Sequence, residues 1–251
     1  VAQAAATLGE MFPGRFHVSL GSGEALNERI TGEKWPIKSE RNARLLECYE
    51  IIKKLFKGET VTHHGRVTVE NAKLYTLPTE LPLLYGAAVT EETAEWVGSW
   101  ADGLTTIHKP IDELKATVKA FRKGGGEGKP MIVKVQLSYA HSEQEAIDGA
   151  YDQWRTNIIQ GTVLGDLHKV EQFDDLGEFV TIDKLKEMVN ISSNPQVHAD
   201  YIQSYIDLGF DTIILHNVNR DQETFIKDFG EKVLPAFRSK SIMNKIKNLV
   251  S

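Results

Sequence analysis

Strand-like and helix-like segments alternate along this chain, and the alternation limits the folds that it can adopt. Each of five short apolar segments is followed by a segment with helical spacing: 16–20, 82–89, 102–107, 131–139 and 211–215. Such repeats predict an α/β protein with a parallel sheet or barrel. A closed eight-unit barrel also runs to about 250 residues, so the length would permit closure, but five units do not make eight. We therefore expect three further units upstream of Val1, about 90 residues at roughly 30 residues a unit.

Capping side chains mark where several of the helices should begin. Ser39 is expected to cap a helix that ends near Lys57, and Thr90 and Ser142 are expected to cap two later ones. Asn194-Pro195 is typical of another helix start. The segment Val1–Met11 has the spacing of a helix without a capping residue.

The stretch Arg15–Glu28 is the best candidate for a functional site. Its strand, Phe16–Leu20, runs into Gly21, Ser22 and Gly23, and the first side chain beyond them that can move a proton is Glu24. Glycines after a strand expose backbone N–H groups at the carboxyl edge of a sheet. The pattern matches neither G-x-G-x-x-G nor a G-K-[ST] phosphate loop, and turn chemistry alone also explains such glycines.

Composition and charge exclude several classes of protein. The 251 residues are 41% hydrophobic and 25% charged, with a net charge of −6 and no dense basic track, so we expect no nucleic-acid partner. No apolar run approaches the about 20 residues of a membrane span, and no signal peptide opens the chain. One or two domains, a cytoplasmic location and no membrane contact are therefore expected.

Two features that suggest metal or thiol chemistry have simpler interpretations. His63 and His64 lie in an alternating segment, 61–69, that predicts a β-hairpin, and neighbours on a strand point to opposite faces. Turn histidines are therefore favoured over metal ligands, and we expect no metal. Cys48, the single cysteine, lies in an apolar helical pattern that favours a buried, inert thiol.

Two segments lie outside the regular strand–helix pattern. Residues Ile158–Val180 have no clear period, and we expect an insertion with short helical pieces that serves as a lid or a partner contact. Residues Ser239–Ser251 form a basic tail, which leaves 1–238 as a single domain.

Four sequence blocks carry a resemblance to a known family. They are GSGEALNE at Gly21–Glu28, WVGSWADG at Trp96–Gly103, GEGKP at Gly126–Pro130 and LGFDTIILH at Leu208–His216. With these blocks the chain resembles the bacterial luciferase-like superfamily of flavin- and F420-dependent oxidoreductases. It is most similar to the branch of F420-dependent glucose-6-phosphate dehydrogenase and its flavin-using relatives. The resemblance implies a TIM (β/α)8 barrel whose fourth strand is Phe16–Leu20 and whose first three βα units are lacking here.

The resemblance also implies a cofactor and a set of site residues. The family binds FMN or coenzyme F420 at the carboxyl end of the barrel, and Glu24 would lie near the reacting ring as acid or base, with a structural ion pair as its other interpretation. Cofactor contacts are implied at Ser22, Gly23, Asn27, Ala88, Val89 and Thr93. Substrate contacts are implied at Thr106, His108 and Lys109.

This sequence differs from F420-dependent glucose-6-phosphate dehydrogenase in two places that bear on the choice of cofactor and of substrate. Ala88 and Val89 stand where that enzyme has a pair of glycines, and the bulkier side chains favour FMN, with F420 as the alternative. Lys109 matches one of the cationic residues with which that enzyme binds the phosphate of its substrate. Glu223 or Thr224 stands at the position of another such residue, and a glutamate there would repel phosphate. Glucose 6-phosphate is therefore disfavoured. The family's catalytic histidine and tryptophan would lie upstream of Val1.

The expected function is an oxidoreductase that acts on a small organic substrate by hydride transfer or by flavin-dependent monooxygenation. A monooxygenase would need a separate flavin reductase, and relatives commonly form homodimers. One alternative is a non-catalytic flavin-binding homologue. Another is a hydrolase with Glu24 as general acid, which would need a second carboxylate, and Asp102 sits at the wrong end of its strand.

Overall fold

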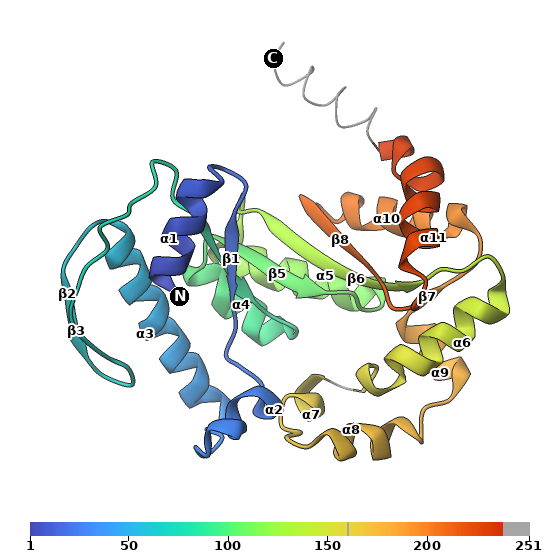
Figure 1. Cartoon of the computed structure of the whole chain (residues 1–251), viewed down its shortest axis with the longest axis horizontal. Coiled ribbons are helices and arrows are strands. Elements are labelled where there is room, and N and C mark those ends of the chain that lie inside the picture. Colours follow the sequence, from blue (N-terminus) through green and yellow to red (C-terminus); the bar gives the residue numbers. More distant parts are fainter. Residues whose placement is uncertain (160, 238–251) are drawn as a thin grey trace, which may run out of the picture. The chain divides into compact units, whose positions relative to one another are not determined.

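The computed structural model describes residues 1–159 and 161–237, so the basic tail Ser239–Ser251 lies outside the described residues. The chain forms two compact units, and each is described by itself (Figure 1). The first unit comprises residues 1–106, 116–131 and 165–168, and the second comprises residues 107–115, 132–164 and the chain from 169 onward. The single domain 1–238 stays a prediction.

The first unit is built on parallel strands. β1 (His17–Leu20) pairs with β4 (Leu83–Ala87), and β4 pairs with β5 (Gly103–Ile107). These strands were expected from the sequence, with ends one to two residues longer. The helices of this unit are α1 (Ala2–Met11), α2 (Ala25–Glu28), α3 (Lys38–Phe56) and α4 (Glu91–Trp100), with a 3₁₀ turn at Arg29–Thr31.

In the first unit the predicted cap of α4 is confirmed and the predicted cap of α3 is wrong. Thr90 caps α4 as predicted, because its hydroxyl accepts a hydrogen bond from the backbone N–H of Thr93. The predicted Ser39 cap of α3 is wrong: this helix begins at Lys38 after Ile37, which makes no side-chain cap bond. Its start is instead held by Arg41, which donates to the carbonyl of Pro36.

Helix α4 covers one face of β4 at close range. A Cβ atom at Gly86 would lie 2.5 Å from Cγ1 of Val97, so this strand position must lack a side chain. Gly86 and the residues at alternate positions of β4 therefore face α4, whereas Tyr85 and Ala87 face the other side of the sheet. The core beneath the helices is formed by Leu20, Leu45, Ile52, Leu55, Phe56 and Leu84 together with their neighbours.

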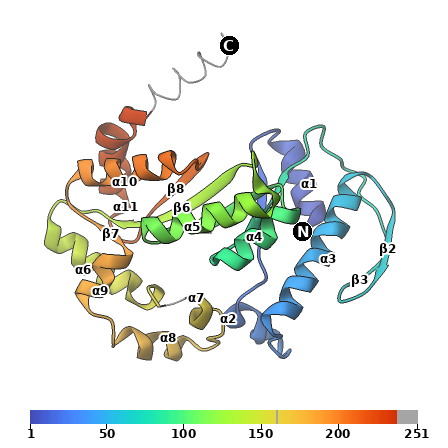
Figure 2. The ribbon, with the colours of Figure 1, turned by 180° about the vertical axis from the view of Figure 1, so that it is seen from behind.

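The predicted hairpin is present and is fixed to α3. β2 (Val61–His64) pairs antiparallel with β3 (Thr68–Ala72), and the two strands run along α3 in both views (Figures 1 and 2). His63 and His64 lie in β2 itself and not in the turn. They contact different carboxylates, Glu47 on α3 and Glu70 on β3.

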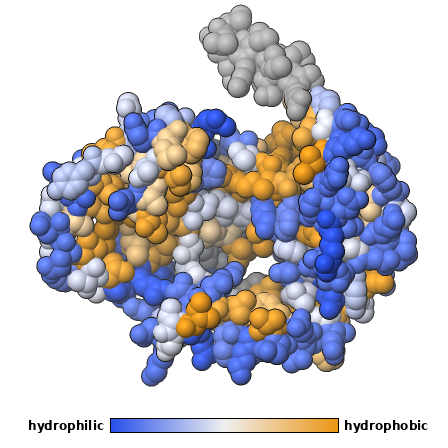
Figure 3. Space-filling view, in the orientation of Figure 1, coloured by the Kyte–Doolittle hydropathy of each residue, from blue (hydrophilic) through white to orange (hydrophobic). Residues whose placement is uncertain are grey.

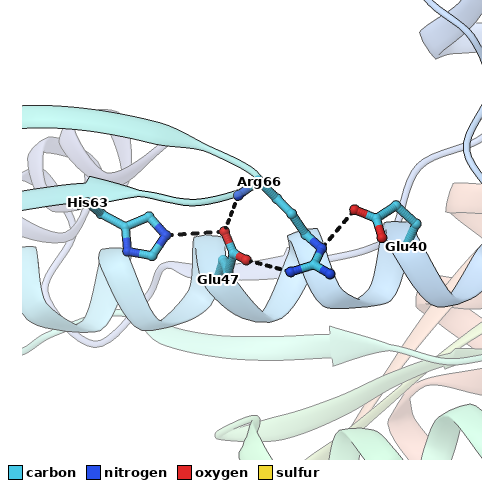
Figure 4. A network of polar contacts seen from close by, with 4 residues as sticks. All are labelled: Glu40, Glu47, His63 and Arg66. Carbon is cyan, nitrogen blue, oxygen red and sulfur yellow. Dashed lines mark hydrogen bonds and ion pairs between the residues drawn. The ribbon is translucent and has the colours of Figure 1, made fainter.

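A polar network joins the hairpin to α3 (Figure 4). Glu47 accepts hydrogen bonds from the backbone N–H and the guanidinium of Arg66, at 2.8 and 3.0 Å, and its carboxylate lies 3.1 Å from Nε2 of His63. Glu40 holds the same guanidinium at 2.7 Å. These bonds, led by those from Arg66 and His63, lower the pKa of Glu47 to about 2.

The second unit also contains a parallel sheet. β6 (Met131–Ser138) pairs with β8 (Thr212–Asn217) and, at its carboxyl end, with the short strand β7 (Asn190–Ile191). The count of five parallel strands was wrong, because β7 is a sixth parallel strand in the described residues, apart from the β2–β3 hairpin. Two residues are too few to show a strand period.

Helices cover one face of this sheet. α10 (Pro195–Asp207) and α11 (Gln222–Asp228) lie against β6 and β8 (Figure 1), where Leu137, Ala199, Ile202, Leu215, Phe225 and Phe229 pack together. Asn194 caps α10 and Ser142 caps α6 (Glu143–Trp154), as predicted. A π-helical turn at Phe229–Val233 follows α11.

The remaining segments are short helices and turns. The predicted insertion contains α7 (Gly161–Leu164) and α8 (Val170–Gly177), after a 3₁₀ turn at Arg155–Asn157, and α9 (Ile182–Met188) follows it. α5 (Ile111–Phe121) is followed by a π-helical turn at Arg122–Gly126, which contains three consecutive glycines, Gly124, Gly125 and Gly126. Among the described residues no helix is both long and apolar enough to cross a membrane.

Candidate functional site

The loop after β1 presents backbone and one carboxylate at the carboxyl edge of the first unit's sheet. Glu24 is the residue before α2, with an extended backbone, and its carbonyl accepts the backbone N–H groups of Asn27 and Glu28 at 3.1 Å each. The side-chain amide of Asn27 donates to Oε2 of Glu24 at 3.4 Å. Both side chains are exposed, so the structure brings the predicted acid and the predicted amide together where a ligand can reach them.

The glycines of this loop keep the edge free of side-chain bulk. Gly23 has a φ of +85°, and a Cβ atom there would lie 2.9 Å from Oε1 of Glu28. A Cβ at Gly21 would meet just one atom within 4 Å among the described residues, Cβ of Ala87 at 3.7 Å. The backbone at Gly21 is therefore open enough for a planar ring to approach it, which is the property that FMN or F420 would need, whereas the side chain of Glu28 occupies the Cβ side of Gly23.

Side chains from two strands meet on the same edge. The hydroxyls of Ser19 on β1 and Thr105 on β5 lie 2.7 Å apart. Their bond crosses the face on which Tyr85 and Ala87 of β4 lie. This bond joins β1 to β5 across β4, beneath the predicted cofactor residues.

The other predicted cofactor residues differ from one another in burial and in position. Ala88 is buried and its N–H donates to the carbonyl of Thr105, so that amide belongs to the strand ladder, whereas Val89 is 39% exposed. Thr93 lies in the first turn of α4 and lines a cavity of about 380 Å³ between α3 and α4, together with Ser39, Asn42, Ala43, Leu46, Glu92 and Trp96. Contacts of Ala88, Val89 and Thr93 with a cofactor stay predictions.

The predicted substrate residues lie at the end of β5 and immediately after it. Thr106 is 1% exposed, and its hydroxyl has no hydrogen-bond partner among the described residues. His108 and Lys109 come immediately after the strand and are both partly buried. These three substrate contacts also stay predictions.

A hydrogen-bond chain fixes the ring of His108. Asn190 on β7 donates its side-chain amide to the hydroxyl oxygen of Tyr205 at 3.1 Å, and this hydroxyl lies 2.7 Å from Nδ1 of His108. Because the amide donates to the hydroxyl oxygen, the hydroxyl proton is free to point at Nδ1, and a hydrogen bond in that direction leaves Nδ1 as the acceptor. The ring is then neutral with its proton on Nε2, and burial lowers the pKa of His108 to about 4.

A further polar group was missed by the sequence analysis. Lys134 on β6, Trp154 at the end of α6 and His216 on β8 lie together in the second unit. The signal for Lys134 was present, since it interrupts an otherwise apolar strand segment. The contact with Trp154 could not be read from the sequence, because it depends on how α6 returns to the sheet.

The hydrolase interpretation does not obtain its second acid from Asp102. Asp102 precedes β5 at the amino ends of the strands, where it accepts from the ammonium group of Lys53 at 3.1 Å and from the backbone N–H of Leu84 at 2.9 Å. Glu24 stands at the opposite, carboxyl edge. Asp102 is therefore a structural acid and does not complete a carboxylate pair with Glu24.

Parallel strands with a glycine loop and one acid at their carboxyl edge are typical of α/β enzymes, a class that binds its ligands at that edge. Residues 1–212 match the family model described as luciferase-like monooxygenase. The chain belongs to this family, and membership places it among oxidoreductases.

Curated relatives and solved structures agree with this assignment. The chain is 30% identical to an F420-dependent glucose-6-phosphate dehydrogenase of Microbacterium testaceum, over 96% of this chain and 74% of the relative. It is also 30% identical to an enzyme of the same name from Kineococcus radiotolerans, over 95% of this chain and 73% of the relative.

Two solved structures bear on the fold. An F420-dependent secondary alcohol dehydrogenase in complex with an F420-acetone adduct has a TM-score of 0.86 at 25% identity, over 94% of this chain and 73% of that one. The oxygenating constituent of 3,6-diketocamphane monooxygenase from Pseudomonas putida, in complex with FMN, has a TM-score of 0.66 at 15% identity, over 93% and 75% of the two chains. The chain therefore has the luciferase-like barrel fold, while the three missing units stay a prediction.

Proposed function

We propose that the protein is an oxidoreductase that binds FMN or coenzyme F420 at the loop Gly21–Asn27 and transfers redox equivalents to or from a small organic substrate. The observation that carries the proposal is the open glycine edge beside Glu24 and Asn27. When bound, the flavin-type ring would supply hydride transfer or, with oxygen, monooxygenation.

The chain's own residues have separable tasks in this proposal. Gly21 lets the ring approach the backbone, and Asn27 orients the carboxylate of Glu24 through the 3.4 Å contact. Glu24 would hold or remove the proton of the substrate hydroxyl, because a carboxylate within hydrogen-bond reach is a general base for that step.

The choice of cofactor rests on two opposing observations. The names of the curated relatives and of the alcohol dehydrogenase favour F420. The side chains of Ala88 and Val89 favour FMN, because they occupy space that glycines would leave for a cofactor tail. A non-catalytic cofactor-binding homologue is the second candidate function, and turnover separates it from an enzyme.

The proposal includes expectations about location, oligomeric state and partners. We expect a cytoplasmic homodimer without nucleic-acid or membrane partners, and a separate flavin reductase if the reaction is a monooxygenation. A deazaflavin-dependent dehydrogenase would need no such partner.

The test compares wild-type protein with Glu24→Gln and with Glu33→Gln, a matched change at an exposed glutamate. Absorbance of FMN and of F420 would be followed with a panel of small alcohols, ketones and aldehydes. We expect turnover with one cofactor, a loss of roughly 10²–10⁴-fold in kcat for Glu24→Gln, and no loss for Glu33→Gln. Unchanged turnover in Glu24→Gln would remove its acid–base role, and binding without any turnover would favour the non-catalytic homologue.

A further inference from the structure

The start of α2 is held by a residue from a distant part of the chain. The backbone N–H of Ala25, the first residue of α2, donates to the carbonyl of Gly165 at 3.0 Å. The first N–H groups of a helix have no partner within it, and Glu24, the residue before α2, makes no side-chain cap bond. The carbonyl of Gly165 therefore supplies the cap, immediately beside the candidate acid.

The next residue, Asp166, fastens this segment to the chain before and within α3. Its Oδ1 accepts a hydrogen bond from the indole N–H of Trp35 at 2.9 Å and lies 3.7 Å from the guanidinium of Arg41. The guanidinium in turn lies over the Trp35 ring, 4.1 Å from its centroid. We call Trp35, Arg41, Gly165 and Asp166 the clamp. All four residues belong to the first unit, as does Ala25.

The charge of Asp166 balances that of Arg41. The side chain of Arg41 is 11% exposed, and Asp166 is its one ion-pair partner among the described residues. A mostly buried guanidinium needs a counter-charge, because its removal from water is costly. The side chain of Asp166 is itself 67% exposed, and so the hydrogen bond from the indole adds a direction that an exposed ion pair lacks.

The loop between α2 and α3 has little packing of its own. α2 has four residues, too few for a helix to be stable without other contacts. A cavity of about 90 Å³ is lined by residues of this loop together with Glu28 and Arg44, and Ile30 is 82% exposed. The visible surface of the loop is largely hydrophilic (Figure 3). Polar contacts such as the clamp therefore set the position of this segment.

We propose that Asp166 positions Glu24 for the reaction without touching the substrate or the cofactor. Asp166 keeps the clamp closed, the closed clamp keeps the carbonyl of Gly165 on Ala25, and this bond fixes the turn that carries Glu24. The carboxylate must be held in one place, because a misplacement of about 1 Å can cost roughly 10²-fold in rate. The inference rests on the proposed function, since Asp166 acts only through Glu24.

The first measurement follows the clamp without any reaction. Hydrogen exchange of the Ala25 amide, measured by NMR, reports whether Gly165 still accepts its hydrogen bond. We expect exchange in Asp166→Ala to be roughly tenfold faster or more than in the wild type. Asp175→Ala, at an exposed aspartate of α8, is the control and should exchange at the wild-type rate. Equal exchange in folded Asp166→Ala would overturn the clamp.

Two further variants separate the two contacts of Asp166. Asp166→Asn retains an oxygen for the indole N–H and loses the charge, whereas Trp35→Phe loses the indole N–H and retains a ring beneath Arg41. Each should expose the Ala25 amide in part, and wild-type exchange in both would overturn the clamp. Thermal unfolding would verify that each variant folds. If Asp166→Ala does not fold, Trp35→Phe replaces it in every comparison.

The second measurement is the single-turnover rate at saturating cofactor and substrate, in a double-mutant cycle with Glu24→Gln. Asp166→Ala should be roughly tenfold slower or more than the wild type, and it should cause no further loss when Glu24→Gln is already present. A merely structural contact would slow both backgrounds by the same factor. That result, or a wild-type rate in Asp166→Ala, would overturn the positioning role.

Failure of the proposed function gives a different result from failure of the clamp. Wild-type protein that neither binds nor turns over FMN or F420 would contradict the function, and the positioning role would fall with it. Faster Ala25 exchange in Asp166→Ala would then still establish the clamp as a structural contact. Turnover in the wild type, with equal Ala25 exchange in Asp166→Ala, would leave the function standing and overturn the clamp.

Discussion

The hydroxyl of Tyr205 lies 2.7 Å from Nδ1 of His108, although the two residues are 97 positions apart in the chain. Asn190 donates its amide to the oxygen of that hydroxyl, which leaves the hydroxyl proton free to be directed at the imidazole. Tyr205 is thus a positioning residue that selects the Nε2–H tautomer of His108.

Tyr205→Phe should release this tautomer and destabilise the protein. The change leaves the amide of Asn190 and Nδ1 of His108 without their shared partner in a buried place, which costs about 1–3 kcal/mol. Urea unfolding measures the loss, and NMR of the ring nitrogens shows whether the proton still resides on Nε2. Tyr201→Phe, at an exposed tyrosine of the same helix, is the control and should alter neither quantity. An unchanged tautomer in Tyr205→Phe would show that the hydroxyl does not direct it.

The buried, neutral His108 should make stability depend on pH. Its pKa is lowered from 6.5 to about 4 by burial, so between these values the unfolded chain binds a proton that the folded protein does not. Stability is therefore fully present above pH 6.5 and decreases as the pH falls toward 4. Urea unfolding at several pH values should show a smaller decrease for His108→Gln than for the wild type. His64→Gln, at an exposed histidine, should retain the wild-type slope.

Glu47 should produce a second, more acidic transition. Its pKa falls from 4.5 to about 2, mainly through the hydrogen bonds from Arg66 and His63. The hairpin's attachment to α3 is then fully stabilised above pH 4.5 and weakens as the pH falls through 2. Glu47→Gln should lower stability at neutral pH and flatten the acid slope, whereas Glu50→Gln on the same helix should not. Hydrogen exchange at Thr68–Ala72 reports the hairpin directly, and protection equal to wild type in Glu47→Gln would be inconsistent with this role.

Local patterns in the sequence were sufficient for much of the fold. The caps at Thr90, Ser142 and Asn194 and the alternating β2–β3 hairpin depend on neighbouring residues, and the structure confirms them. Glu24 and Asn27 were predictable as a pair for the same reason, being three residues apart on one turn. The start of α3 differed because Ile37 and Lys38 carry no cap signal.

Contacts between distant segments could not be predicted. β7 has two residues and no period, so neither the strand nor the position of Asn190 was visible. The bond between Tyr205 and His108, and the contact of Trp154 with Lys134, depend on how helices return to the sheet. The resemblance supplied the cofactor residues and His108 as a substrate contact, but it contained no information on which side chains hold these groups in place.

Direct titration of the cofactors tests the central claim that the loop Gly21–Asn27 binds a flavin-type ring. Fluorescence of FMN and of F420 would be followed as wild-type protein and Gly23→Val are added. Valine should abolish binding because Gly23 has a φ of +85° and a Cβ there meets Glu28. Gly230→Ala, where a Cβ meets no atom within 4 Å, is the control. The account predicts saturable quenching of at least one cofactor by the wild type and by Gly230→Ala, and none by folded Gly23→Val. Quenching of neither cofactor by the wild type, or equal quenching by Gly23→Val, would contradict it.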